Sequence, residues 1–261
     1  MTAEIDPRIG QDRVGLFLTR GQIEHAGKTA VYAQMLTDNS RNTICYGSSE
    51  KFGVLGNPLN PDQKRRAIQG LWGADAFELV FLEDIGATNN LTDWADYVFQ
   101  AIGESGKAEP TDLYAGSIND ARWYEAHFAS LNGAPSYRRG LFDVWENPES
   151  GKRIHILDRE KHIRISSSDV RSMIERRDPA WRDHVPAKLW AFYEWEYPGH
   201  LRTAIPLDGA PEDWPDLDAC PAGTKGIRVA DRDGTKEVLI LRADGKWRPR
   251  TAAESGKSLG D

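Results

Sequence analysis

Short apolar runs alternate with amphipathic segments along most of the chain, and this alternation constrains the fold more than any other feature. Strand-like runs occupy residues 13–19, 42–46, 77–82, 112–115 and 153–157. Helical spacing of apolar residues follows at 25–36, 62–72, 91–102, 121–131, 168–177 and 187–194. Strands that alternate with helices predict an α/β fold, a Rossmann-like parallel sheet with helices on both faces.

One helix start is marked by two adjacent residues. Asn60 is a suitable N-cap, and Pro61 follows it at the first helical position, where its missing N–H is not needed. The helix that contains residues 62–72 is therefore expected to begin here.

The pattern changes after Pro198. Residues 206–221 are rich in Pro, Asp and Gly, and predict a linker or an ordered loop. Residues 226–241 alternate around Asp233-Gly234, which predicts a β-hairpin. We therefore expect a main domain at 1–198, and a linker, β-hairpin appendage and disordered tail at 199–261. The hairpin could brace the core, cover a site or mediate assembly, and a structural appendage is the favoured interpretation.

Composition narrows the classes of partner. The 39% hydrophobic content suffices for a core, yet no apolar run approaches the roughly 18–20 residues of a membrane span. Residues 1–13 are polar and lack the apolar stretch of a signal peptide, so we expect a cytoplasmic protein without a membrane partner. The net charge of −7 argues against nonspecific nucleic-acid binding.

The cysteines do not suggest a metal centre. Cys45 and Cys220 form no CxxC pair and no Cys/His cluster. We therefore expect no structural zinc site, and we assign no metal-ligating residue.

The first candidate site is His25-Ala26-Gly27-Lys28, which follows a strand and a Gly-containing turn. Free amides and the positive end of the helix dipole make such a helix start an anion site. His25 and Lys28 share one face of the first turn, so together they can hold a triphosphate and stabilise developing charge. Arg20 adds a cation at the strand end.

Two other interpretations of this segment are open. The first is that Gly27-Lys28-Thr29 ends a P-loop. The spacing argues against it, because a P-loop requires four residues between its glycines, whereas Gly21 and Gly27 have five between them. A solvated polar helix start without a ligand is the second.

The second candidate site is Ser166-Ser167-Ser168, followed by Asp169-Val170-Arg171. Serines before an apolar-periodic helix are typical of an N-cap, and a simple capping segment is the ordinary interpretation. The functional interpretation is that hydroxyls and free amides bind phosphate, with the Arg171 guanidinium reaching the same anion.

Together these segments resemble the His-x-Gly-His-type nucleotidyltransferase superfamily, typified by nicotinamide mononucleotide adenylyltransferases. The early signature, Gly-Arg-Phe-x-Pro-x-His-x-Gly-His, fits residues 19–28 without a gap. Arg20, His25 and Gly27 match it, whereas the departures are Thr19, Gly21, Ile23 and Lys28. The late signature, Ile-Ser-x-Thr-x-Ile-Arg, fits residues 165–171, and Trp181 with Val185-Pro186 is similar to the pattern that follows.

The resemblance covers about residues 13–197 and implies further contacts. Gly47-Ser48 resembles the Gly-Ser at the end of the second strand, and Asn57-Pro58 with Arg65 or Arg66 resembles the next conserved stretch. It implies that the mononucleotide substrate is bound by Ser48, Asp84, Asn89 and Trp94, the last three in the segment that holds the nicotinamide moiety. It also implies that ATP is held by Arg20, Gly27, Gly116, Asn119, Ser166, Ser167 and Ser168.

The implied reaction transfers AMP from ATP to nicotinamide mononucleotide, giving NAD and pyrophosphate. His25, Lys28 and Arg171 would be the catalytic residues, and Mg²⁺ would bridge the phosphates with few protein ligands. Related enzymes are often oligomers, so the resemblance also implies a homo-oligomer.

Lys28 keeps two alternatives open, because lysine is a flexible charged donor where the signature has histidine. The acceptor could be another phosphate, such as phosphopantetheine or a sugar or alcohol phosphate. Alternatively, the chain could be a non-catalytic nucleotide sensor on the same scaffold.

Overall fold

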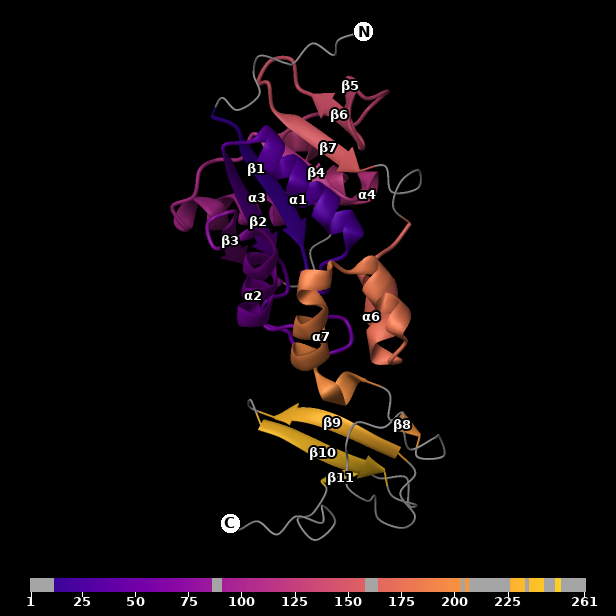
Figure 1. Ribbon diagram of the computed structural model, residues 1–261. Coiled ribbons are helices and arrows are strands. Elements are labelled where there is room, and N and C mark those ends of the chain that lie inside the picture. Colours follow the sequence, from indigo (N-terminus) through magenta and orange to yellow (C-terminus); the bar gives the residue numbers. More distant parts are fainter. Residues whose placement is uncertain are drawn as a thin grey trace. The chain divides into compact units, whose positions relative to one another are not determined.

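The computed structural model describes residues 12–85, 91–157 and 164–202, together with strands at 205–206, 226–232, 235–241 and 247–249 (Figure 1). The chain divides into two compact units. The first comprises Met1–Arg171 and Ala180–Glu196, and the second comprises Ser172–Pro179 and Tyr197–Asp261. The predicted boundary at residue 198 stays a prediction.

The first unit is built on a seven-stranded sheet of order β3-β2-β1-β4-β7-β6-β5. Its parallel strands are β1 (Val14–Thr19), β2 (Arg41–Tyr46), β3 (Glu78–Phe81), β4 (Asp112–Ala115) and β7 (Arg153–Leu157). The strand order reverses between β1 and β4, which makes this point the topological switch of the sheet.

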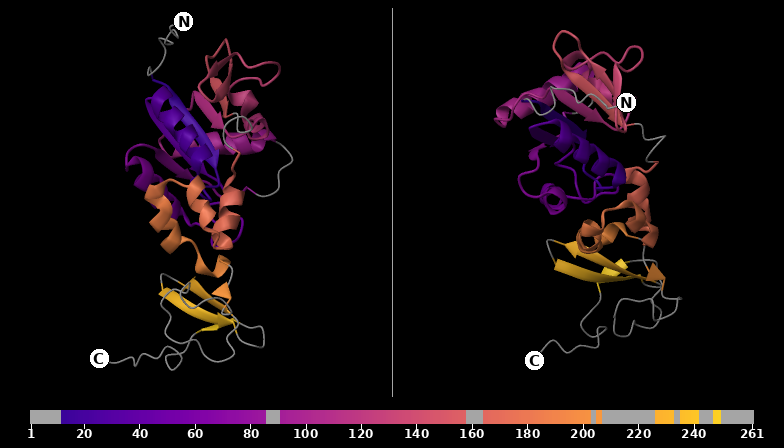
Figure 2. Two further views of the ribbon diagram at one scale, coloured as in Figure 1. Left: turned by 45° about the vertical axis from the view of Figure 1, so that its right-hand side comes forward. Right: turned by 45° about the horizontal axis from the view of Figure 1, so that its top comes forward.

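Helices cover both faces of this sheet, because successive side chains of a strand point to opposite faces. Leu16 of β1 packs in a core cluster with α3 (Leu91–Glu104) and the 3₁₀ helix η1 (Arg122–His127). Phe17 packs in a second cluster, with α1 (Ala26–Asp38) and α2 (Pro61–Trp72). In Figure 2, the indigo helix α1 runs alongside the strands. The predicted Rossmann-like α/β fold is confirmed.

Local capping residues begin two of these helices. Asn60 caps α2: its side chain accepts from the Gln63 N–H, and the Gln63 side chain accepts from the Asn60 N–H. Pro61 occupies the first turn, as predicted. His25 caps α1, with its side chain accepting from the Gly27 N–H.

Two parts of the sheet-bearing unit differ from the sequence prediction. An antiparallel pair, β5 (Tyr137–Arg139) and β6 (Phe142–Glu146), extends the sheet beyond β7, and no strand was predicted here. These strands are short and mixed in polarity, so the pattern alone does not reveal them. The predicted helix at 121–131 is instead α4 (Ile118–Ala121) followed by η1, because Phe128 and Ala129 leave the helical path and enter the core.

The described carboxyl-terminal segments follow β7. They comprise α6 (Ser167–Glu175), η2 (Pro179–His184), η3 (Ala187–Leu189), α7 (Trp190–Glu196) and η4 (Gly199–Leu201). A second sheet has the order β11-β10-β9-β8, with strands β8 (Ile205–Pro206), β9 (Gly226–Arg232), β10 (Thr235–Leu241) and β11 (Trp247–Pro249). Antiparallel pairing of Arg232 with Thr235 confirms the predicted hairpin. The predicted tail at 251–261 lies outside the described residues.

A largely buried polar network joins Arg13, which precedes β1, to Asp112 of β4 and His155 of β7. Asp112 is 1% exposed and lies 2.6 Å from the Arg13 Nε and 2.8 Å from the His155 Nε2. Burial tends to raise the pKa of Asp112, but the hydrogen bond from His155 and the Arg13 charge outweigh it, so the pKa lies below its ordinary value. The ionised carboxylate therefore stabilises the folded unit.

We expect Asp112→Asn to destabilise the protein by about 3 kcal/mol, because it leaves the Arg13 guanidinium without its counter-charge and the buried His155 ring without its carboxylate partner. A depressed carboxyl pKa contributes stability above the unfolded value of about 3.9 and loses it as the pH falls through the folded value. Stability of the wild type should therefore fall more steeply below about pH 4 than that of the variant. Urea unfolding followed by circular dichroism measures both effects.

Glu78→Gln is the matched control, since Glu78 pairs with Arg41 in an exposed bridge. This change should cost less than about 1 kcal/mol. Equal losses for the two variants would show that the buried network does not carry the stability assigned to it.

Candidate functional site

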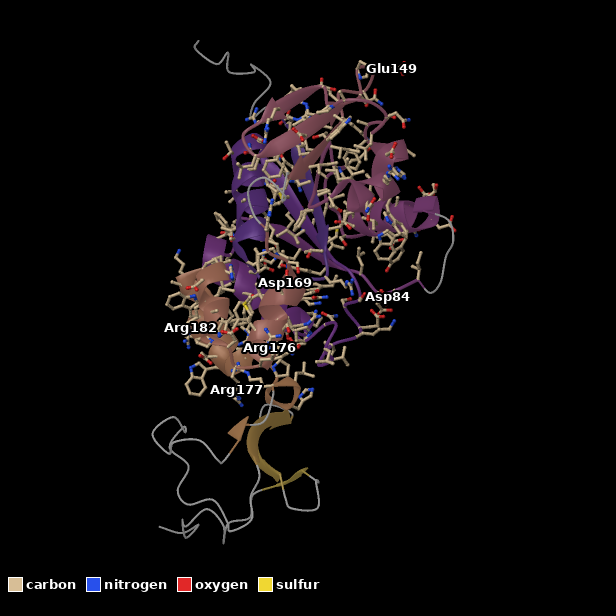
Figure 3. All side chains as sticks on the ribbon, turned by 90° about the vertical axis from the view of Figure 1, so that its right-hand side faces the viewer. Asp84, Glu149, Asp169, Arg176, Arg177 and Arg182 are labelled. Atoms are coloured by element: carbon tan, nitrogen blue, oxygen red, sulfur yellow. The ribbon has the colours of Figure 1, made fainter. Side chains whose placement is uncertain are left out.

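A pocket of about 760 Å³ opens at the carboxyl ends of the parallel strands, on both sides of the β1/β4 switch point. Its size is in the range typical of small-molecule sites. Figure 3 shows Asp84 and Asp169 at the same end of the sheet-bearing unit, and Glu149 at the opposite end. The predicted site residues that line the pocket are Arg20, His25, Gly27, Lys28, Ser48, Asp84, Trp94, Gly116, Ser166 and Ser167.

Other predicted residues lie elsewhere. Ser168 and Asn119 are exposed and, in the part of the chain that the structure describes, do not line the pocket; Asp120, next to Asn119, does. Arg171 donates from Nη1 to the Gln22 Oε1 and is likewise absent from the described pocket wall. Asn89 lies outside the described residues.

The turn between β1 and α1 lines part of the pocket, and its backbone geometry depends on one glycine. Gly21 has a φ of 60°, and a Cβ there would lie 2.5 Å from two ring atoms of Tyr46, so only glycine fits. His25 is 5% exposed, and its Nδ1 accepts from the Gly27 N–H at 3.2 Å. In the neutral ring the proton is therefore on Nε2, which makes that atom a donor.

The start of α6 is both a helix cap and a part of the pocket wall. Ser166 donates from its N–H and its Oγ to the Asp169 Oδ2, and the Asp169 N–H donates back to the Ser166 Oγ. The Ser167 Oγ donates to the Ile23 carbonyl at 3.3 Å, and Arg171 donates to Gln22. These contacts join the two segments that the sequence singled out, although they lie far apart in the chain.

A charged group lies at the ends of β2 and β3. The Asp84 carboxylate accepts from the Ser48 Oγ at 2.7 Å and from the Lys51 Nζ at 2.6 Å. These hydrogen bonds, the Lys51 bond first, lower the pKa of Asp84. Asp84 is therefore ionised at neutral pH. Lys51 lines the pocket but was not predicted; its position three residues after Ser48 was the available signal.

Aromatic side chains form another part of the wall. The Trp94 Nε1 donates to the Tyr124 Oη at 2.8 Å, which fixes the orientation of the indole. Burial raises the pKa of Tyr124, so its hydroxyl stays neutral. Trp123 also lines the pocket and is 36% exposed. Neither Trp123 nor Tyr124 was predicted, because both fall in a segment assigned to an ordinary helix.

The described residues contain no group of three His, Cys, Asp or Glu side chains that could hold a metal ion. The pocket wall does carry the separate carboxylates of Asp84 and Asp120.

None of the described helices is long and apolar enough to cross a membrane.

No family model matches the chain, and no curated protein matches it. Solved structures that are similar include NadR protein in complex with NAD and AMP-PNP, at 14% identity and a TM-score of 0.46, over 69% of this chain and 46% of that one. Another is NadR protein in complex with NR, at 15% identity and a TM-score of 0.44, over 68% of this chain and 44% of that one. This chain thus covers less than half the length of either NadR chain.

We expect a nucleotide to contact the two pocket tryptophans. Adding MgATP or nicotinamide mononucleotide should quench tryptophan fluorescence, and Trp94→Phe or Trp123→Phe should each remove part of the change. Trp123→Ala should weaken the binding of at least one of these ligands by about fivefold or more, given stacking of roughly 1–3 kcal/mol.

Trp195→Phe is the control, because Trp195 is 66% exposed and is not part of the described pocket wall. Quenching that depends on Trp195 and on neither pocket tryptophan would place the ligand elsewhere.

Proposed function

We propose that this chain transfers AMP from ATP to nicotinamide mononucleotide, giving NAD and pyrophosphate. The observation that carries the proposal is the shared pocket. The start of α1, the start of α6 and the tryptophans of α3 and η1 all contribute to one cavity at the switch point of the sheet. Cations and hydroxyls suited to phosphates thus meet aromatic faces suited to bases.

The phosphate end of the site consists of Arg20, His25 and Lys28, with the hydroxyls of Ser166 and Ser167. Each of the first three can donate hydrogen bonds to phosphate oxygens, and Arg20 and Lys28 are basic side chains. Donors placed before the reaction stabilise the charge that develops on the transferred phosphoryl group.

The reaction needs no covalent enzyme intermediate. An oxygen of the acceptor phosphate attacks the α-phosphorus of ATP in line, the bond to the β-phosphate oxygen breaks, and pyrophosphate leaves. Catalysis is then chiefly positioning and charge stabilisation. In this proposal magnesium arrives as part of the MgATP substrate, bound chiefly by the phosphates and with few protein ligands.

The part of the pocket proposed to bind the acceptor substrate favours a cationic ring. Nicotinamide mononucleotide carries a positive pyridinium, which an ionised carboxylate and an aromatic face both attract. Asp84 and Trp94 supply these two groups on the same pocket wall. Phosphopantetheine and sugar or alcohol phosphates lack such a cation, and they are the alternative acceptors.

A nucleotide sensor on the same scaffold is the second candidate. It is favoured by Lys28, which is buried and lies 3.6 Å from the Glu24 carboxylate. A sensor would bind ATP or NAD without turnover.

We expect the purified protein to form NAD and pyrophosphate from MgATP and nicotinamide mononucleotide, as measured by chromatography of the products. His25→Ala and Arg171→Ala should each lower turnover at least about tenfold, or about 1.4 kcal/mol of barrier. The first removes a donor from the pocket, and the second removes the support that the turn receives through Gln22.

His184→Ala, which changes a histidine of η2 outside the described pocket wall, serves as the control and should keep normal turnover. Absence of NAD at high enzyme concentration would exclude the proposed reaction. A panel of acceptors would then test the other phosphates, and calorimetry with ATP and NAD would test the sensor.

A further inference from the structure

Six buried polar side chains gather beside the pocket, and we call them the Glu24 cluster. They come from the turn before α1, from α1 itself, and from β2, α2 and α7. The members are Glu24, Lys28, Tyr32, Tyr46, Lys64 and Tyr193, each no more than 7% exposed. Of these, only Lys28 belongs to the described wall of the pocket.

The cluster contains one carboxylate and two amines. The Lys28 Nζ lies 3.6 Å from the Glu24 Oε1, too far for a hydrogen bond. Within the described residues, neither the Lys28 Nζ nor the Lys64 Nζ has a hydrogen-bond partner. The Lys64 Nζ lies 5.9 Å from the centre of the Tyr46 ring. A buried ammonium without hydrogen-bond acceptors is costly, so an arriving anion would gain strong interactions here.

Glu24 opposes the loss of charge on both lysines. Burial lowers the pKa of Lys28, and the Glu24 charge raises it. Burial and the charge of Lys28 lower the pKa of Lys64 to about 8, and Glu24 again opposes the shift. Without the carboxylate, desolvation and mutual repulsion of the two ammonium groups would both favour neutral amines.

The tyrosines do not compete with Glu24 as anions. Burial, followed by the Glu24 charge, raises the pKa of Tyr32, Tyr46 and Tyr193. The Tyr193 Oη also accepts from the Glu24 backbone N–H at 2.7 Å, which holds the turn in place. The three tyrosine hydroxyls therefore stay neutral at neutral pH.

We propose that Glu24 is a positioning residue, which holds the Lys28 ammonium at the pocket wall as a cation and releases it to a phosphate group of the bound nucleotide. The inference rests on the proposed function only in that the pocket binds nucleotide phosphates. Lys28 is the member that reaches the pocket, and its distance from Glu24 leaves its hydrogen-bonding capacity for the phosphate oxygens. Lys28 keeps its proton when its ammonium group leaves Glu24 and binds the phosphate.

Other titratable groups lie near the pair and bear on any pH dependence. Glu24 and Lys28 are accompanied within the cluster by Lys64 and the three tyrosines. The charged or titratable groups of the pocket wall are Arg20, His25, Lys51, Asp84, Asp120 and Tyr124.

The test is the pH dependence of MgATP binding, measured by calorimetry between about pH 7 and pH 9.5 for the wild type and Glu24→Gln. Affinity should fall as Lys28 loses its proton. In Glu24→Gln the fall should occur at a pH lower by at least about one unit, a tenfold change in proton affinity. Glu149→Gln, which removes an exposed carboxylate at the opposite end of the unit, should follow the wild-type curve (Figure 3).

A double-mutant cycle assigns the shift to Lys28. In a Lys28→Gln background, adding Glu24→Gln should not shift the pH dependence of MgATP affinity any further. In a Lys64→Gln background, adding Glu24→Gln should still shift it. Glu24→Asp keeps the charge and should retain a titration close to that of the wild type. Circular dichroism and thermal unfolding establish which variants fold. If Glu24→Gln does not fold, the pH curve of Lys28→Gln still tests whether Lys28 causes the fall in affinity.

A wild-type curve for Glu24→Gln, or an equal shift in the Lys28→Gln background, would overturn the positioning role. If Glu24→Gln does not fold, a wild-type pH curve for Lys28→Gln would overturn it as well, because the proposal assigns the fall in affinity to Lys28. Absence of MgATP binding to the wild type at every pH would also overturn it. Binding with the expected shift but without NAD formation would support the role of Glu24 and reject the proposed reaction, so the two failures are distinguishable.

Discussion

Parallel pairing of β1 with both β2 and β4 is the constraint on which the rest of the molecule depends. Because the strand order reverses at β1, the connections on its two sides leave over opposite faces of the sheet. The carboxyl ends of the two neighbouring strands therefore open a cavity that no crossing helix fills. The starts of α1 and α6 and the aromatic side chains of α3 and η1 contribute to its wall.

Three basic side chains reach the cavity of this acidic chain, beside the carboxylates of Asp84 and Asp120. The net charge is −7, yet Arg20, Lys28 and Lys51 all reach the pocket. The last two lie beside carboxylates, those of Glu24 and Asp84. Such local arrangements, rather than net charge, decide whether a phosphate binds, since charges beyond about 8–10 Å are screened by salt. Lys28 thus lies beside the buried carboxyl group of a residue four positions earlier in the chain.

The sequence predicted the parallel strands, most of the helix starts and the strand ends at which the pocket lies. It did not predict β5 and β6, because their short runs of mixed polarity are recognisable as strands only once β6 pairs with β7. It also missed Lys51, Trp123 and Tyr124. A periodic pattern shows that an aromatic residue has an apolar environment, but a core and a ligand pocket both provide one.

Some features of this protein were determined by the sequence alone, because the partners lie within one helical turn. The Asn60–Gln63 box, the His25 cap on Gly27 and the Ser166–Asp169 pair are of this kind. Tertiary structure alone decided that Arg171 bonds to Gln22, that Tyr193 accepts from Glu24, and that Lys64 lies near Glu24 and Lys28. These contacts join segments that only the packing of several elements brings together, so no local pattern can encode them.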